Sequence, residues 1–267
     1  MIREITLGQY YDEESVIHSL DPRVKLVGTI IFIVSLFVVD NIWGYLIAAL
    51  FLCGVIALSK VPVKYMIKGM KAIIVILLIT VLFNLFLTPG DPLVSIWKIN
   101  ISKQGAKIAG MMAVRLTFLI IGSSVMTLTT TPNNLTDGLE RLLRPLKVIK
   151  VPVHEIAMMM SIALRFIPIL LEETDIIMKA QMARGADFES GNIVKRAKAL
   201  VPLLVPLFVS AFRRANDLAM AMEARCYRGG EGRTKMKPLK YVKRDYLAYA
   251  VIWSYLALCV VVGRILF

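Results

Sequence analysis

Two tripeptides in the second half of the chain carry the residues best suited to bind a partner: Ala183-Arg184-Gly185 and Ala224-Arg225-Cys226. Each follows a long segment that is apolar early and charged late. The small alanine allows close approach to another surface. The arginine beside it presents a planar guanidinium with five donors, which suits bidentate pairing with a carboxylate. We therefore interpret both tripeptides as helix ends that dock into grooves of a partner.

The two tripeptides belong to an internal repeat. Shifting the chain by 41 residues pairs Leu170–Arg184 with Ala211–Arg225. In each copy an apolar run with prolines leads into a charge cluster and then into a helix of small and methionine residues. Each arginine could instead only complement the negative end of a helix dipole, as a cation in any last turn does. The duplication favours two similar partner sites.

The helix stops differ between the two copies. Gly185 tolerates positive φ and is a typical C-terminal stop. After Arg225 the next glycines are Gly229 and Gly230, so the sequence predicts that the second helix ends there. The carboxylates Glu172, Glu173 and Asp175 are interpreted as a solvated helix face or as partners in intramolecular ion pairs.

The composition indicates an all-α integral membrane protein. Hydrophobic residues make up 57% of the 267 positions, against ~45–50% in soluble domains. The formal charge is +13, but no basic run carries interleaved aromatic residues, so nucleic-acid binding is not predicted. The basic residues are expected to set the membrane topology and to contact lipid headgroups.

Five apolar runs predict five transmembrane helices. The N-terminal membrane domain, residues 1–131, has four, and residues 245–267 hold the last. The runs are Leu26–Val39, Ile42–Leu58, Ala72–Leu87, Ala106–Thr130 and Leu247–Val262. Several are a little short of the ~20 residues that cross a bilayer, but flanking lysines and arginines can extend the usable span.

Three smaller features accompany these runs. Lys60, Lys64 and Lys68 recur on one face of a helix expected to lie along the membrane surface. The alternation in Val94–Ile99 predicts a short hairpin. Arg115 falls inside the fourth run, where a charge is costly in lipid, so it should face the bundle interior or a partner, or lie near an interface.

A count of basic residues places the N-terminus in the cytoplasm. Residues 132–244 then form a cytoplasmic coupling domain. We expect long amphipathic helices there, at about 133–147, 152–186 and 193–227, because the prolines and internal charges of this region are unfavourable in a membrane span. Met158–Met160 would offer an adaptable apolar contact surface.

A short polar motif precedes the first apolar run. Asp21 before Pro22 predicts a helix N-cap with proline at the first helical position. Arg23 and Lys25 place positive charge just before the membrane. The histidines and cysteines are scattered, without the spacing of metal ligands, so no metal, cofactor or disulfide is predicted.

Three motifs together resemble those of the transmembrane T component, EcfT, of energy-coupling factor transporters, a CbiQ-like family of ABC importers. The motifs are Leu20–Leu26, Gln181–Phe188 and Glu223–Gly229, in the expected order, and the resemblance covers essentially the whole chain. The departure is Cys226, where the family often has glycine. It weakens a role for that third position but not for Arg225.

The resemblance implies a multi-pass subunit of the bacterial cytoplasmic membrane that is not itself an enzyme. It would join two cytoplasmic EcfA-type ABC ATPases to a substrate-binding S component, for uptake of a vitamin or a transition metal. The docking residues would be Ala183, Arg184, Gly185, Ala224, Arg225 and Cys226. No phosphate-binding loop is visible in the chain itself.

Two other classes of function fit the sequence less well. A stand-alone secondary transporter is expected to carry ionisable residues in broken membrane helices, yet only Arg115 lies well inside a clear span. A membrane-bound enzyme needs a convergent cluster of histidine, aspartate or cysteine, and none is evident. The coupling subunit is therefore the preferred hypothesis, and the stand-alone transporter is the alternative.

Overall fold

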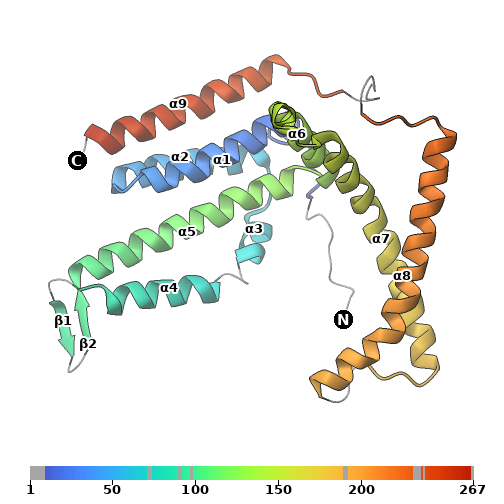
Figure 1. The fold of residues 1–267 in the computed structure, drawn as a ribbon. Helices are drawn as coiled ribbons and strands as arrows, with labels where there is room; N and C mark the ends of the chain where they lie inside the picture. The colour runs from blue at the N-terminus through green and yellow to red at the C-terminus, as the bar shows by residue number, and fades with distance from the viewer. Residues whose placement is uncertain are drawn as a thin grey trace. The chain divides into compact units, whose positions relative to one another are not determined.

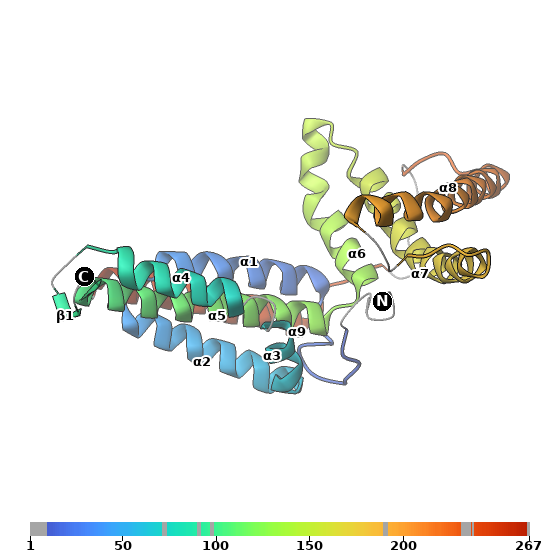
Figure 2. The ribbon, with the colours of Figure 1, turned by 90° about the horizontal axis from the view of Figure 1, so that it is seen from below.

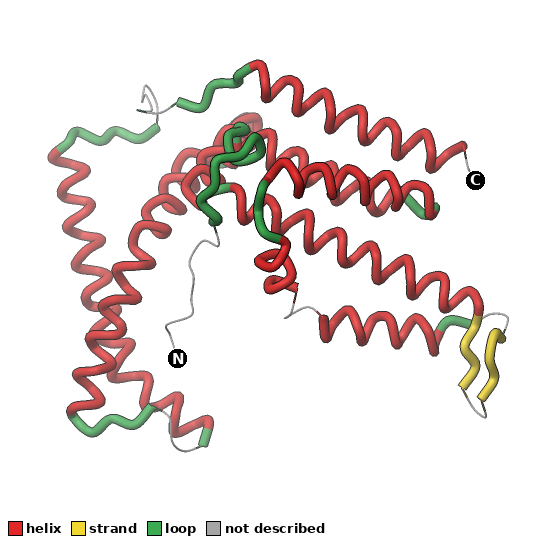
Figure 3. Tube along the Cα trace, turned by 180° about the vertical axis from the view of Figure 1, so that it is seen from behind, coloured by secondary structure: helices red, strands yellow, loops and turns green. Residues whose placement is uncertain are grey.

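The computed structural model describes residues 10–70, 74–89, 92–96, 99–188, 192–230, 236 and 238–265. The described chain is mostly helical, with one small hairpin (Figures 1 and 3). It separates into two compact units. The first consists of Met1–Leu142 and Leu239–Phe267, and the second of Leu143–Pro238.

The first unit is a bundle of five long or apolar helices with shorter connecting elements. The long helices are α1 (Pro22–Val38), α2 (Ile42–Ser59), α4 (Ile74–Leu87), α5 (Lys103–Thr129) and α9 (Lys243–Ile265). The shorter elements are α3 (Val63–Met70), α6 (Pro132–Leu143) and the antiparallel strands β1 (Pro92–Ile96) and β2 (Ile99–Ser102).

These elements confirm the helices predicted from the apolar runs, and a hairpin forms at the predicted place, although residues 97–98 lie outside the described part. By length and hydropathy, five of the described helices are candidate membrane spans, and this set differs from the five spans predicted from the apolar runs. They are α2, α5, α9 and two helices of the second unit, α7 (Val153–Ala183) and α8 (Ile193–Ala224). At 17 and 14 residues, α1 and α4 fall short of that criterion.

Helix α5 is the centre of the bundle. It packs against α1, α2, α3 and α4, and α9 packs against α1 and α2 (Figure 2). Phe32, Phe51 and Tyr255 stack where α1, α2 and α9 meet, with the Phe51 and Tyr255 ring centroids 4.2 Å apart. Gly122 of α5 allows close approach, because a Cβ there would lie 2.5 Å from Cε1 of Phe32.

Arg115 faces the interior of the bundle, where polar groups satisfy it. Its Nε donates to the Tyr45 hydroxyl at 2.9 Å, and Nη2 donates to the Val39 carbonyl at 3.2 Å and to the Asp40 carboxylate at 3.0 Å. The side chain is 14% exposed. Arg115 of α5 is thus hydrogen-bonded to the turn between α1 and α2. These hydrogen bonds offset most of the free-energy cost of placing a charge inside an apolar run.

The motif before α1 forms a buried network at the start of the bundle. Asp21 caps α1 by accepting from the Arg23 backbone N–H at 2.9 Å and from the Arg23 guanidinium. Burial alone would raise the pKa of Asp21, but the hydrogen bonds from Arg23 lower it below its usual value. Lys25 donates to the carbonyls of His18 and Thr129, which joins the N-terminal segment to the end of α5.

Asp245 connects the two ends of the chain within this unit. Its carboxylate is 1% exposed and accepts from the Asp21 N–H at 3.0 Å and from the Val242 N–H at 2.8 Å. The guanidinium of Arg23 also lies 3.7 Å from the ring centroid of Tyr241. The beginning of α9 is therefore held against the beginning of α1 by contacts that are distant in sequence.

Replacing Asp245 by Ala is expected to destabilise the protein by about 2–4 kcal/mol, because it leaves one buried and one partly buried backbone N–H group without an acceptor. Asp245→Asn, which keeps one acceptor oxygen, should lose less. The measurement is equilibrium unfolding in mixed detergent micelles. Asp12→Ala, at an exposed carboxylate, is the matched control and should change stability by under about 0.5 kcal/mol. Equal stability of Asp245→Ala and this control would contradict the role assigned to Asp245.

The second unit contains α7, α8 and a short 3₁₀ helix, η1 (Arg144–Ile149). The helix predicted at about 133–147 is shorter than expected. It ends as α6 at Leu143, because Pro145 cannot continue an α-helix, and the chain goes on as η1. The two compact units meet at 142/143 and 238/239. The division into membrane and coupling domains at 131/132 and 244/245 stays a prediction.

Candidate docking site

The first candidate docking end closes α7 with a Schellman motif. Ala183 is the last helical residue, Arg184 is the C-cap, and Gly185 follows with φ of 87°. The Ala186 N–H donates to the Gln181 carbonyl at 3.0 Å, and the Gly185 N–H donates to Met182 at 2.9 Å. These bonds satisfy carbonyls that a helix end otherwise leaves free, and they fix the direction of the chain at Arg184.

The second candidate end closes α8 in the same way. Ala224 is the last helical residue, and Cys226 takes the left-handed position with φ of 56°. The Tyr227 N–H donates to Met222 at 3.0 Å, and the Cys226 N–H donates to Glu223 at 2.8 Å. Every bond is the 41-residue counterpart of one at the end of α7.

The sequence-based expectation for this second end was wrong. The helix stops at Ala224 and not near Gly229 and Gly230. The third position of each tripeptide has the same backbone role, because both residues provide the left-handed turn after the helix. Cysteine adopts this conformation at some steric cost, which glycine avoids.

Gly185→Val is expected to loosen the last turn of α7 by roughly 1–2 kcal/mol, because a β-branched residue is strained at positive φ even where space is open. Cys226→Gly should leave the last turn of α8 as ordered as before or more so. Amide hydrogen exchange at residues 182–186 and 222–227 measures both effects. Unchanged exchange in Gly185→Val, or faster exchange in Cys226→Gly, would contradict the backbone role of the third position.

Both arginines are available at the surface. Arg184 and Arg225 are exposed, and within the part of the chain that the structure describes neither guanidinium group has a hydrogen-bond or ion-pair partner. Two guanidinium groups on equally capped helix ends can each receive a carboxylate. The two helix ends thus share one capping geometry and each presents one exposed guanidinium group.

Helices α7 and α8 cross while running in opposite directions, so that the C-terminal end of α7 lies low and the C-terminal end of α8 lies high in Figure 1. An ion pair joins them: Arg214 Nη2 lies 3.0 Å from Glu173 Oε2, and Ser210 also hydrogen-bonds the Glu173 carboxylate. Apolar residues of both helices, including Phe166, Leu170 and Leu218, line a hollow together with Arg214. Glu173 therefore belongs to an intramolecular ion pair, one of the two interpretations that the sequence left open.

The ion pair joins equivalent positions of the repeat. Glu173 and Arg214 are separated by 41 residues, which is the repeat length. Beyond the pair each helix runs ten further residues, to Ala183 and to Ala224, or about 15 Å at the α-helical rise. Ala183 and Ala224, at the two candidate docking ends, thus lie equally far along their helices from the contact between Glu173 and Arg214.

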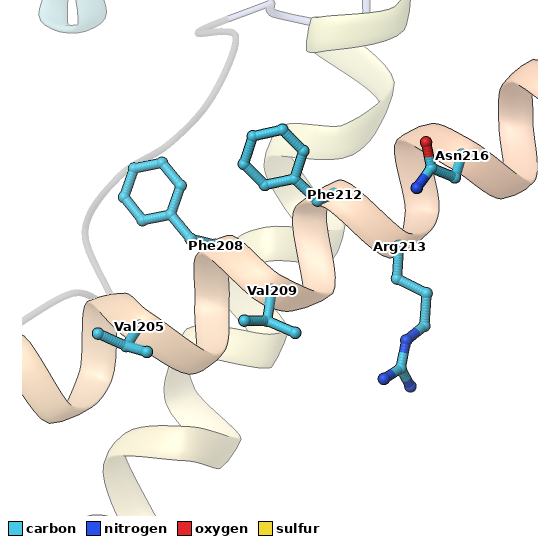
Figure 4. Close-up of a pocket in the computed structure, with 6 residues that line it drawn as sticks. All are labelled: Val205, Phe208, Val209, Phe212, Arg213 and Asn216. Carbon is cyan, nitrogen blue, oxygen red and sulfur yellow. The ribbon is translucent and has the colours of Figure 1, made fainter.

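A second surface of α8 is apolar and exposed. Val205, Phe208, Val209 and Phe212 line an open hollow with Arg213 and Asn216 (Figure 4). The two phenylalanines are 62% and 68% exposed. Sequence analysis overlooked this surface, although its spacing of i, i+3, i+4 and i+7 is that of one helix face. On α7, Met159 and Met160 of the predicted contact surface are also exposed.

The remaining motif residues have a different role. Asp21, Pro22, Arg23 and Lys25 belong to the first unit, at the start of α1, and not to either docking end. Within the described residues there is no group of three or more histidine, cysteine, aspartate or glutamate side chains placed to hold a metal ion.

Comparison with known proteins finds relatives of one family that match nearly the full length of this chain. A model of the family CbiQ, described as cobalt transport protein, matches residues 13–236. A relative from Clostridium kluyveri is 56% identical over 250 residues, covering 93% of both chains. One from Bacillus subtilis is 50% identical over 248 residues, covering 92% of this chain and 93% of its own. Both relatives are described as energy-coupling factor transporter transmembrane protein EcfT.

Proposed function

Because the chain belongs to the EcfT family of energy-coupling factor transporter transmembrane proteins, we propose that it couples two ATPases to a separate substrate-binding membrane subunit. The chain is a multi-pass membrane protein. The proposal concerns how the second unit does the coupling. The observation that carries it is the pair of identically capped helix ends, each with an exposed arginine.

Each docking end is proposed to enter a groove on one ATPase. The guanidinium of Arg184 or Arg225 would pair with a carboxylate in that groove, and Ala183 or Ala224 would allow close approach. Two equivalent ends suit two similar ATPase subunits. Closure of the ATPases on ATP would move the ends relative to each other, and the crossed helices would carry this motion along their length.

The apolar face of α8 is proposed to contact the substrate-binding subunit. Val205, Phe208 and Phe212 form a stripe of the kind that packs into a groove of another helical protein. Motion of α8 would then tilt or release that subunit and so move the bound micronutrient. The identity of the vitamin or metal would reside in the other subunit.

The second unit is proposed to lie in the cytoplasm, with the N-terminus also inside. Helices α7 and α8 are apolar enough to qualify as candidate spans. However, each has a charge cluster near its middle, Glu172–Asp175 in α7 and Arg213–Asp217 in α8, that would lie at membrane depth if the helix crossed the bilayer. We infer that α1 and α4, which pack into the bundle around α5, cross the bilayer in place of α7 and α8.

Co-purification tests the proposed function. The wild-type protein, expressed with ATPases encoded beside it and solubilised in mild detergent, should retain two ATPase subunits per chain. ATP-dependent uptake should appear in proteoliposomes only when a substrate-binding subunit is added. Retention of no ATPase by the folded protein, together with uptake by this chain alone, would favour the stand-alone transporter.

A further inference from the structure

The turn between α6 and α7 exposes aliphatic side chains to an unusual degree. Val148 and Ile149, at the end of η1, are 88% and 72% exposed, and Leu146 is 37% exposed. Two adjacent β-branched residues displayed at the tip of a turn gain favourable free energy when a nonpolar environment covers them. Neither belongs to the docking ends or to the apolar face of α8.

The shape of this turn is fixed by its own hydrogen bonds. Lys150 adopts φ of 61°, and its N–H donates to the Lys147 carbonyl at 3.0 Å. The Val151 N–H donates to the Leu146 carbonyl at 3.4 Å. These bonds close the turn in the manner of a helix C-cap, so that Val148 and Ile149 stay at its tip.

Positive charge surrounds the tip. Arg141, Arg144, Lys147 and Lys150 follow one another at intervals of three, and no acidic residue lies between Glu140 and Glu155. Residues three apart fall on the same side of a 3₁₀ helix, so Arg144 and Lys147 share one side of η1. The turn therefore combines an apolar tip with a cationic border.

The chain places the start of this turn close to an end of the membrane bundle. Arg144 directly follows α6, and α6 packs on the first residue of α1: a Cβ on Gly138 would lie 3.0 Å from Cβ of Pro22. That end of the bundle is where α1 begins and where α5 ends, at Thr129. A segment that leaves the bundle at a helix end starts near the boundary between hydrocarbon and water.

We propose that the turn formed by residues 144–150 is a membrane-contact surface that inserts Val148 and Ile149 among lipid chains and binds anionic phospholipid headgroups through its border of cations. Apolar residues flanked by lysine and arginine are the composition of interfacial membrane elements. Anionic lipid is the occupant we favour, because the stretch 141–154 carries cations and no acidic side chain, which matches a uniformly negative surface. The contact would anchor the junction between the two units whether or not ATPases bind.

The test measures the depth of a nitroxide label at position 149. Ile149→Cys is labelled in a background where Cys53, Cys226 and Cys259 are serine, and the full chain is placed in nanodiscs of phosphatidylcholine and phosphatidylglycerol. Collision with oxygen should exceed collision with an aqueous nickel chelate, which indicates insertion by about 5–10 Å. Ile176→Cys is the matched control. It is similarly exposed, at 67%, but has acidic neighbours, and should favour the aqueous chelate.

The charge requirement is tested in the same assay. Arg144→Gln with Lys150→Gln, or nanodiscs of phosphatidylcholine alone, should shift the label at position 149 at least several-fold toward the aqueous reagent. Val148→Cys provides a second label position if the first impairs folding. A label at the tip that favours the aqueous chelate in anionic nanodiscs would overturn the proposal. So would shielding from both reagents regardless of lipid, since this indicates a protein contact.

Discussion

Arg184→Glu combined with Arg225→Glu is expected to abolish co-purification of both ATPases while leaving the chain folded and inserted in the membrane. Both arginines are exposed at the ends of their helices, so their replacement disturbs little inside the protein. In the complex, by contrast, each new carboxylate would face an acidic groove. Leaving a buried charge unpaired, or opposed by a like charge, costs about 2–5 kcal/mol at an interface.

The single variants separate the two ends. Arg184→Glu and Arg225→Glu should each weaken retention of one ATPase, with a loss of about 30-fold or more in affinity at that end, since 1.4 kcal/mol corresponds to tenfold. Lys103→Glu is the matched control, because it changes the net charge equally at an exposed residue that belongs to the first unit and to neither docking end. Full retention and transport by the double variant would show that the arginines do not dock.

Glu173→Arg is expected to uncouple transport from ATP hydrolysis while both ATPases remain bound. The substitution places two cations face to face at the crossing of α7 and α8, where Glu173 and Arg214 now lie 3.0 Å apart. The pair is partly exposed, so its loss should cost the protein only about 1 kcal/mol of stability. Its effect on coupling should be larger, several-fold in transport per ATP, because the crossing sets the separation of the docking ends.

Exchanging the two charges distinguishes this role from simple destabilisation. Glu173→Arg with Arg214→Glu restores an ion pair in the opposite sense and should recover most of the coupling. Glu172→Arg, at the neighbouring exposed carboxylate, is the matched control and should behave like wild type. Spin labels at the two helix ends should report a broader distance distribution in Glu173→Arg alone. An unchanged distribution, or no rescue by the exchange, would refute the role of the pair.

The fold was predictable wherever local pattern determines structure. The apolar runs predicted the helices of the bundle, and the Asp21-Pro22 pair predicted the start of α1 and its cap. The repeat located the ends of α7 and α8 to within a few residues. The predicted helix end at about residue 147 was wrong, because Pro145 cannot continue an α-helix and the chain goes on as η1.

The missed features depend on contacts between distant segments or on the backbone alone. Asp21 and Asp245 are 224 residues apart, and no local pattern indicates that they share a hydrogen bond. The pairing of Glu173 with Arg214 follows only from how two helices cross. The left-handed turn at Cys226 was missed because cysteine rarely takes that conformation, whereas the 41-residue repeat with Gly185 was a signal for it.

The contact between Glu173 and Arg214 has a consequence for the symmetry of the second unit. When equivalent residues of a duplicated segment touch each other, the rotation that exchanges the two copies must be close to two-fold, with its axis passing through that contact. The crossed helices would then present one pseudo-symmetric surface made from a single chain. Such a surface can receive a pair of identical ATPases as readily as two different ones that share a fold.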